Sequence, residues 1–455
     1  MSRPDALHGA GRPREYSRRN LRALSDYLDA TENEVAVDGL FFRMYGLQPS
    51  DVGRLPRPAT WCKAAAKARR TSRLVAHLSR LVWLCGGGSL FHARQAGKLE
   101  QHCTATTSTA SSTTPLRGEY VLGLTARAAD VAKAVLPRNP DRQWVTVPWV
   151  ATDIRPDQGR ELPLLSLVSR SELAEALRLA RAAQRLFGKR TNLHSWELQT
   201  YTALRWFLVR TALMKLHGHF IMTEHYDRWA VLVDGVVAEH RRCGRRTQLT
   251  LIQHGLIETD SYTGLDTGFQ IALSRRLHEV TSLFTYNRAS ETVFKAHVLG
   301  PQSNSSHLTV AYFTPRLEVS SFPSTHACRI LFVGHPVCER LHVHLYNAVV
   351  SRFPVAAYYK PHPAAAMSQE MATVGWTVVT QANQFPEIDF LISYPSTLVA
   401  EYAALGREAV VHAIDLSPSS ASSVEMQIGQ KLGEILSPET VNSTASVSTS
   451  ERSNP

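Results

Sequence analysis

Three short motifs place histidines or hydroxyl groups directly after short apolar runs. The first is "YYKPHP" (358–363), the second is "ISYPSTLVAEYAALG" (392–406), and the third is "LIQHG" (251–255). Imidazole, hydroxyl and ammonium groups bind phosphate, and imidazole transfers protons at neutral pH. The three motifs therefore predict phosphate binding and acid–base chemistry.

In the first motif, two prolines flank a histidine and restrict the backbone on either side of it. Pro361 and Pro363 fix φ and lack a backbone N–H, so the apolar run before them cannot continue as a central strand. The imidazole of His362 can then donate to a phosphate, and Lys360 adds a positive charge nearby. A histidine that merely caps the strand is the alternative.

In the second motif, a strand end is followed at once by a helix. Pro395 ends the strand, and Ser396 and Thr397 take the N-cap and first helical positions. Gly406 ends the helix. Free N–H groups, the helix dipole and two hydroxyls would then converge on a phosphate, although an ordinary N-cap is the alternative. Glu401, one turn inside the helix, binds a sugar hydroxyl or faces solvent, and the sequence favours neither.

The other candidate histidines also end apolar runs. His254 follows one such run, and Gly255 permits a tight turn, so the imidazole is placed to take a proton from an acceptor hydroxyl. A histidine buried at a turn is the alternative. His335 in "FVGHPV" (332–337) lines a nucleotide pocket or has a structural role.

Short apolar runs that alternate with helical periods must position these motifs. The first series has predicted strands at 119–125, 143–150, 219–224, 247–255 and 281–287, with helices at 126–136, 171–187, 195–216 and 226–242 and another from 288. The second has strands at 329–335, 355–362, 376–380, 389–395 and 408–413, with helices at 338–351 and 396–406. This alternation predicts an α/β fold with two Rossmann-like domains that face a cleft. Ligands bind outside the carboxyl ends of parallel strands, where all three motifs fall.

The chain is expected to divide into four segments. Residues 1–115 form a basic, mainly helical region with a Ser/Thr-rich loop at 103–115. A Rossmann-like acceptor-side domain (116–322) and a Rossmann-like nucleotide-donor domain (323–436) follow, separated by a Pro/Ser-rich connector. Residues 437–455 form a disordered tail, because their Ser/Thr-rich composition cannot bury enough apolar surface.

The composition is that of a folded protein with a basic surface. Hydrophobic residues make up 44% and charged residues 20% of the 455 residues, and the formal net charge is +11. Such a charge attracts nucleic acid, an anionic membrane face or phosphorylated substrates, or it is only a solvated basic surface. The arginine clusters at 12–22, 63–73 and 239–246 contain a single aromatic residue, Tyr16, and so are not interleaved with aromatics as an RNA-binding platform is. No nucleic acid is expected as a partner.

The six cysteines show no C-x-x-C spacing, which argues against a zinc ribbon and a dense disulfide framework. A reducing cytoplasmic location fits this pattern. No apolar signal segment begins the chain, and the longest apolar stretch carries Arg205, Arg210 and Lys215. We therefore predict no signal peptide and no membrane span.

The histidine motifs and the two predicted domains resemble the GT-B transferases that use cytidine-activated donors. These include teichoic-acid glycerophosphotransferases, capsule Kdo transferases and bacterial sialyl- and polysialyltransferases. The resemblance rests on "K-x-H-P" and "D-x-L-I-S-x-x-S-T", covers 325–415 well and 219–298 moderately, and is absent before 115. It implies that His362, Ser396 and Thr397 bind the donor phosphate. It also implies that His254 is essential to catalysis.

This chain departs from the sialyltransferases in one sequence motif. Their acidic-acidic-Gly motif has its nearest matches at Asp38–Gly39 and Asp234–Gly235, both with valine at the first acidic position. Asp234 also falls inside a predicted helix.

The resulting hypothesis is transfer of a glycosyl or polyol-phosphate group from a CMP- or CDP-linked donor to a surface-polysaccharide or lipid-linked acceptor. His254 is the base, while Lys360, His362, Ser396, Thr397, Glu401 and His335 bind the donor. No cofactor is expected, and the absence of an Asp-x-Asp motif predicts no metal in the chemistry. The basic region would bring the enzyme to the inner face of the cell membrane. A GT-B-type nucleotide-sugar epimerase and a non-enzymatic basic nucleic-acid- or membrane-binding protein are the alternatives.

Overall fold

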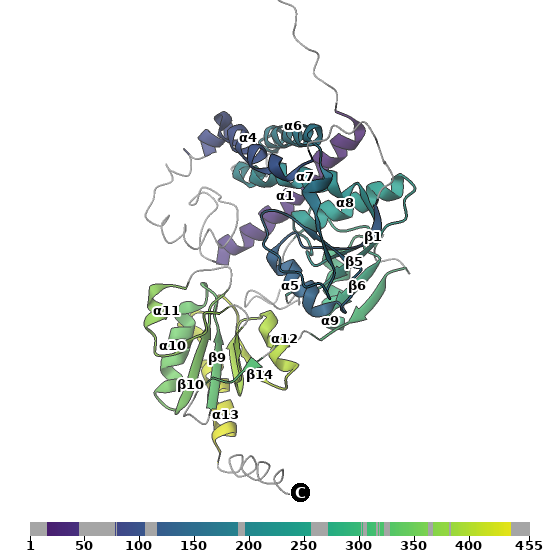
Figure 1. The fold of residues 1–455 in the computed structure, drawn as a ribbon. Helices are drawn as coiled ribbons and strands as arrows, with labels where there is room; N and C mark the ends of the chain where they lie inside the picture. The colour runs from purple at the N-terminus through teal and green to yellow at the C-terminus, as the bar shows by residue number, and fades with distance from the viewer. Residues whose placement is uncertain are drawn as a thin grey trace, which may run out of the picture.

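The computed structural model describes most of the chain. The described residues are 16–44, 78, 80–104, 116–189, 196–255, 272–301, 303, 307–314, 317, 319–322, 328–362, 367–381 and 384–437. The arginine cluster at 63–73, nearly all of the Ser/Thr run and the tail predicted after 437 lie outside these residues. Figure 1 shows two α/β bodies, of which the C-terminal one is drawn in green and yellow.

The first body is built on a seven-stranded sheet in which all neighbouring strands are parallel, in the order β3-β2-β1-β4-β5-β6-β7. Its strands are β1 (Leu116–Leu122), β2 (Gln143–Thr146), β3 (Arg160–Pro163), β4 (Leu216–Met222), β5 (Gln248–Ile252), β6 (Ser282–Thr285) and β7 (Thr309–Tyr312). Its main helices are α5 (Ala126–Val135), α6 (Arg170–Phe187), α7 (Ala203–Leu213), α8 (Arg228–Arg242) and α9 (Arg288–Val293). Tyr120 and Leu122 pack into the large core with α6, α7 and α8, whereas Val121 packs on the opposite face with α5.

The second body is built on a five-stranded parallel sheet in the order β11-β10-β9-β13-β14. Its strands are β9 (Cys328–Val333), β10 (Val355–Lys360), β11 (Thr377–Val378), β13 (Phe390–Ser393) and β14 (Glu408–Val411). Its helices are α10 (Glu339–Val350), α11 (Gln369–Thr373), α12 (Thr397–Ala403) and α13 (Ser422–Leu436), and β8 (Val319–Ser320) pairs with β12 (Phe385–Pro386) beside the sheet. Phe332 faces α10 and α13, whereas Leu331 faces α12. The predicted α/β fold with two Rossmann-like units is confirmed.

The strand registers set which residues are level at the carboxyl edge of each sheet. In the first sheet Met222 pairs with Leu251, and in the second Val333 pairs with both Lys360 and Ser393. Parallel strands run in the same direction, so residues at equal distances beyond these pairs lie side by side. Polar residues from distant parts of the sequence therefore meet at each edge.

Some elements differ from the sequence-based expectation. The helix predicted over 195–216 is divided into a 3₁₀ segment, η5 (Glu197–Thr202), and α7, and the Thr200 hydroxyl donates to the Glu197 carbonyl at 2.7 Å within η5. The edge strands β3 and β7 and the helix α13 were not predicted. Both edge strands are short and have few buried residues, so their sequences lack a clear apolar pattern. The remaining short helices are η1 (Trp83–Gly87), η2 (Glu100–His102), η3 (Leu164–Leu167), η6 (Phe294–Val298) and η7 (Pro418–Ser420).

The end of α12 is formed as predicted by a glycine in the left-handed region. Gly406 has φ of 72°, its N–H donates to the Ala403 carbonyl at 3.0 Å, and the N–H of Arg407 donates to the Tyr402 carbonyl at 2.9 Å. These two bonds form a Schellman motif, which favours glycine at this position.

The N-terminal helices pack on the first body and share its core. Helices α1 (Arg18–Met44) and α4 (Gly88–Leu99) contribute buried side chains to the same cluster as α6, α7 and α8, and Figure 1 shows α1 crossing this body. A buried ion pair joins Glu34 of α1 to Arg228 at the start of α8, and Arg228 also donates to the Gln199 carbonyl at 3.1 Å. The predicted division at residue 115 remains a prediction.

Two further observations concern the described residues alone. No described helix is long and apolar enough to cross a membrane. The described cysteines are free thiols: Cys85, Cys103, Cys243, Cys328 and Cys338.

The ion pair predicts a large loss of stability when one partner is neutralised. Glu34→Gln leaves the fully buried Arg228 guanidinium without its counter-charge, and we expect a loss of about 3–5 kcal/mol in the free energy of unfolding. Seven of the eight tryptophans precede residue 230, so urea unfolding followed by tryptophan fluorescence reports mainly on the first body.

The matched control is Glu100→Gln, which makes the same change in a half-exposed pair with Arg170. A loss below about 1 kcal/mol is expected there. Equal losses in the two variants would show that the buried pair does not attach α1 to α8 in this way.

Candidate functional site

The carboxyl edge of the first sheet brings two histidines into contact. The register of β4 and β5 makes His225 level with His254, and their ring centroids lie 4.2 Å apart. The backbone N–H of His254 donates to His225 Nε2 at 2.8 Å, and His254 Nδ1 donates to the Thr223 carbonyl. A neutral imidazole with its proton on Nδ1 carries its lone pair on Nε2. His254 therefore has the tautomer that a general base needs.

A buried glutamine fixes the backbone on which His254 stands. Gln253 Oε1 accepts from the Thr285 hydroxyl at 2.5 Å and from the Tyr286 N–H at 2.9 Å, while its amide donates to the Gly255 carbonyl at 2.9 Å. Gly255 has φ of 79°, as the predicted tight turn requires. These bonds join the end of β5 to β6 and hold His254 at the edge.

Glu224 is a residue of this edge to which the sequence analysis gave no role. Its side chain is 2% exposed, the Thr125 hydroxyl donates to its Oε1 at 3.2 Å, and its Oε2 has no hydrogen-bond partner among the described residues. Burial, with a smaller contribution from the Asp227 carboxylate, raises the pKa of Glu224 to about 8. A buried carboxyl with a raised pKa at an edge that also carries histidines is typical of acid–base sites. The only sequence signal was its position at the end of the predicted strand 219–224.

The carboxyl edge of the second sheet brings together His335 and His362, which both stand two residues beyond a matched strand pair. Their ring centroids lie 5.0 Å apart, and His335 also contacts Tyr394 at 5.3 Å. His335 Nδ1 accepts from the Val337 N–H at 3.2 Å, which leaves the proton of the neutral ring on Nε2. Burial, together with His362, lowers the pKa of His335 to about 3, so this ring is a neutral hydrogen-bond donor.

Lys360 points into the loop that follows β11. Its ammonium donates to the carbonyls of Gln381 and Gln384, the latter at 3.1 Å, and lies 4.9 Å from the Phe385 ring centroid. Burial lowers the pKa of Lys360. In this conformation the charge stabilises the loop, and direct contact with a phosphate remains a prediction.

Ser396 and Thr397 take the N-cap and first helical positions of α12, as the sequence predicted. Ser396 Oγ lies 3.0 Å from Ser393 Oγ. Glu401 is half-buried in the same helix. His362 and Ser396 follow strands on opposite sides of β9, so they lie roughly 10 Å apart at the usual strand spacing. His335, which follows β9, stands between them.

A cavity of about 740 Å³ between the two bodies contains none of these residues. It is lined by Asp130, Lys133, Ala134, Leu136, Pro137, Arg138, Arg142, Trp144, Asp153, Arg155, Gln158, Leu317 and Phe385. Arg142 precedes β2, so this cavity lies toward the amino end of that strand. The chemistry-bearing edges are separate from it.

Asp234, one of the two nearest matches to the acidic motif of sialyltransferases, is held by hydrogen bonds inside the first body. It lies inside α8 as predicted, is fully buried, and accepts from the N–H groups of His278 and Glu279 at 2.7 Å each. Burial raises the pKa of Asp234 to about 7. Its carboxyl connects α8 to the segment before β6.

The raised pKa of Glu224 predicts that stability falls as the pH rises. The folded carboxyl keeps its proton to about pH 8 and the unfolded one to about 4.5, so the folded state binds more protons between these values. Asp234, with its pKa raised to about 7, also makes stability fall with rising pH, but only up to about pH 7. Between pH 7 and 8 we expect Glu224→Gln to remove a slope of up to about 1.4 kcal/mol per pH unit.

The measurement is urea unfolding at several pH values in this window, with Glu100→Gln as the exposed control. If the free energy of unfolding of Glu224→Gln falls with pH as steeply as that of the wild type, another group releases the proton.

No protein-family model and no curated protein matches this chain. Among solved structures, it is similar to Arabidopsis thaliana UGT89C1 complexed with UDP-L-rhamnose, at 11% identity and TM-score 0.35, over 72% of this chain and 92% of that one. It is similar to UDP-N-acetylglucosamine 2-epimerase from Rickettsia bellii at 10% identity and TM-score 0.32, over 65% and 78% of the two chains. TarM has 9% identity and TM-score 0.29, over 51% and 52%. Likenesses this distant carry over no activity.

Proposed function

We propose that this protein transfers a glycosyl or polyol-phosphate group from a nucleotide-activated donor to a hydroxyl acceptor. The observation that carries the proposal is that each sheet presents histidines at its carboxyl edge. The edges differ in their hydrogen-bonding polarity, because His254 offers a lone pair on Nε2 and His335 offers a proton on Nε2. One edge suits a base, and the other suits a phosphate.

At the first edge, His254 accepts the proton of the acceptor hydroxyl at Nε2. The acceptor oxygen then forms a bond to the transferred group as the bond to the nucleotide phosphate breaks. The bond from Nδ1 to the Thr223 carbonyl orients the ring and stabilises the imidazolium that forms. His225, which accepts from the backbone of His254, is a positioning residue.

At the second edge, the leaving phosphate accepts hydrogen bonds from His335 and His362, with the hydroxyls of Ser396 and Thr397 on the other side of β9. The distance of roughly 10 Å across β9 exceeds the width of one phosphate and suits a diphosphate. Donors that are already oriented stabilise the charge that develops on the leaving group. Lys360 fixes the adjoining loop, and Glu401 remains a candidate for a sugar hydroxyl.

The finer assignments rest on the resemblance of the motifs and on the charge. A cytidine donor and a surface-polysaccharide or lipid-linked acceptor follow from "K-x-H-P" and "D-x-L-I-S-x-x-S-T". The formal net charge of +11 suits anionic donors and attracts the protein to an anionic membrane face on the cytoplasmic side.

The buried Glu224 favours a second candidate, a nucleotide-sugar epimerase. Such a reaction needs an acidic group near the sugar ring, and Glu224 directly precedes His225 at the carboxyl edge of the first sheet. A UDP-sugar incubated without acceptor and followed by NMR would yield an epimer in this case, and only unchanged donor in the case of transfer.

The base assignment predicts the effect of His254→Ala. Transfer from CMP- or CDP-linked donors should fall about 10²–10⁴-fold, because the acceptor hydroxyl loses its base while the donor site is unchanged. Initial rates measure this fall, and the nucleotide-induced rise in melting temperature should remain. His102→Ala, at an exposed position of the same body, is the matched control and should keep the wild-type rate.

The donor assignment predicts the effect of His362→Ala. In a thermal-shift panel of CMP, CDP, UDP and GDP, at least one nucleotide should raise the melting temperature of the wild type. That rise should shrink in His362→Ala and persist in His344→Ala, where a histidine of α10 contacts Glu425. The proposal fails if no nucleotide stabilises the protein and if both His254→Ala and His362→Ala transfer at the wild-type rate.

A further inference from the structure

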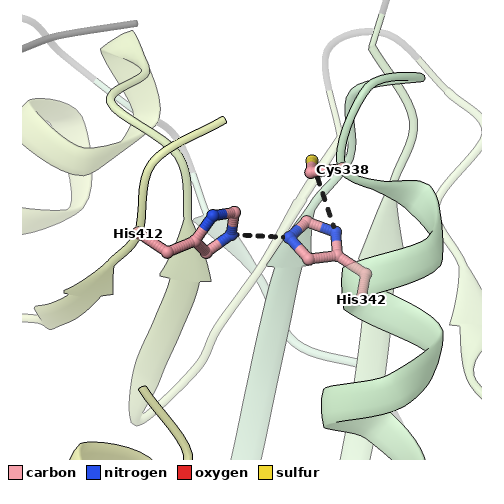
Figure 2. Close-up of side chains that lie close together, drawn as sticks. All are labelled: Cys338, His342 and His412. Atoms are coloured by element: carbon pink, nitrogen blue, oxygen red, sulfur yellow. Dashed lines mark hydrogen bonds between the residues drawn. The ribbon is translucent and has the colours of Figure 1, made fainter. Parts of the chain in front are cut away.

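Two histidines and a cysteine lie together inside the second body, next to the turn that carries His335. Cys338 is the N-cap residue of α10, His342 lies one turn inside that helix, and His412 directly follows β14. They are 1%, 0% and 4% exposed. Figure 2 shows the three side chains pointing toward one another from the helix and the strand end.

The distances between their donor atoms are close to those of a metal site. His342 Nε2 lies 2.9 Å from His412 Nε2, Cys338 Sγ lies 4.0 Å from His342 Nδ1, and one ligand atom from each residue lies within 4.8 Å of the others. In a tetrahedral zinc site the nitrogen atoms are about 3.4 Å apart and each is about 3.6 Å from the sulfur. The two short distances involve different nitrogen atoms of His342, so one ion takes only one of them and the His342 ring must turn for Cys338 and His412 to share that ion.

The hydrogen bond on the far side of His412 supports ligation. His412 Nδ1 donates to the Ala413 carbonyl at 2.8 Å, which leaves the lone pair on Nε2, the atom that faces the cluster. Histidines that bind metals usually donate their other N–H to a carbonyl or a carboxylate in this way. The ring is therefore already in the tautomer and orientation that a metal requires.

Zinc binds a thiolate, so binding displaces the proton of the Cys338 thiol to the solvent, while the two imidazoles bind through nitrogen lone pairs.

A metal-free chain of hydrogen bonds is the competing arrangement. In it the thiol donates to His342 Nδ1, His342 Nε2 donates to His412 Nε2, and His412 Nδ1 donates to Ala413. The first of these bonds is long at 4.0 Å, and the thiol also lies 3.3 Å from the His335 carbonyl. Zinc would replace the first two bonds and keep the third.

We propose that Cys338, His342 and His412 bind one Zn²⁺. A thiolate with two imidazoles is a ligand set that zinc prefers, whereas magnesium and calcium require oxygen ligands. Three protein ligands leave a fourth position for water. The ion would join the start of α10 to the end of β14, elements 70 residues apart, and would hold the turn that carries His335. Sequence spacing predicted no metal because the ligands come from distant segments.

The test measures metal in the full-length protein. After incubation with zinc and dialysis, elemental analysis should find one equivalent per chain in the wild type and much less in Cys338→Ser and His412→Gln. Substitution with Co²⁺ should give the visible absorption of a tetrahedral site and a thiolate-to-cobalt charge-transfer band, and Cys338→Ser should lose that band. Cys243→Ser and His344→Gln remove an exposed thiol and a half-exposed imidazole and should behave as the wild type.

A measurement on the wild-type chain tests the proposal even if the variants fail to fold. Zinc should raise the melting temperature of the wild type, and a chelator should reverse the rise. The proposal is overturned if dialysed wild type holds no more zinc than Cys338→Ser and zinc does not stabilise it. These readouts do not depend on transfer activity, so the proposed function can fail independently.

Discussion

Both bodies depend on the parallel pairing of their strands, because that pairing makes the carboxyl ends level. Met222 pairs with Leu251, so His225 and His254, three residues beyond this pair, come into contact. Val333 pairs with Lys360 and Ser393 in the other sheet. A shift of one residue in either register would turn alternate side chains to the other face and would separate the histidines. The same geometry that buries the apolar strands therefore collects the polar groups.

Burial determines how these polar groups are held. A buried donor or acceptor without a partner costs free energy, so Gln253 bonds to β6 and to the turn after β5, and Arg228 bonds to Glu34 and Gln199. Each such residue joins elements that are distant in the sequence. The candidate base consequently stands on a rigid edge, and α1 is attached to the body that carries it.

The sequence was sufficient to place the strand ends, since short apolar runs stopped by proline or glycine mark them clearly. His335, His362, Ser396 and Gly406 accordingly lie where they were expected. Contacts across the fold could not be predicted in the same way. The sequence did not indicate that Glu34, in a basic region, is buried in a helix. Cys338 and His412 come together only because the start of α10 lies near the end of β14 in the fold. Such contacts depend on helix rotation and strand order, which local patterns do not specify.

The histidines of the two edges have opposite tautomers, which is the basis of the proposed division of the chemistry between them. Both His254 and His335 are fixed at Nδ1, but the first donates from that atom to a carbonyl and the second accepts there from an N–H. The Nε2 atoms consequently have opposite roles, as acceptor and as donor. A transfer reaction needs both, because a proton leaves the acceptor while charge develops on the departing phosphate. In the proposed transfer, backbone groups at the ends of two strands would thus set the direction of proton movement without a charged side chain.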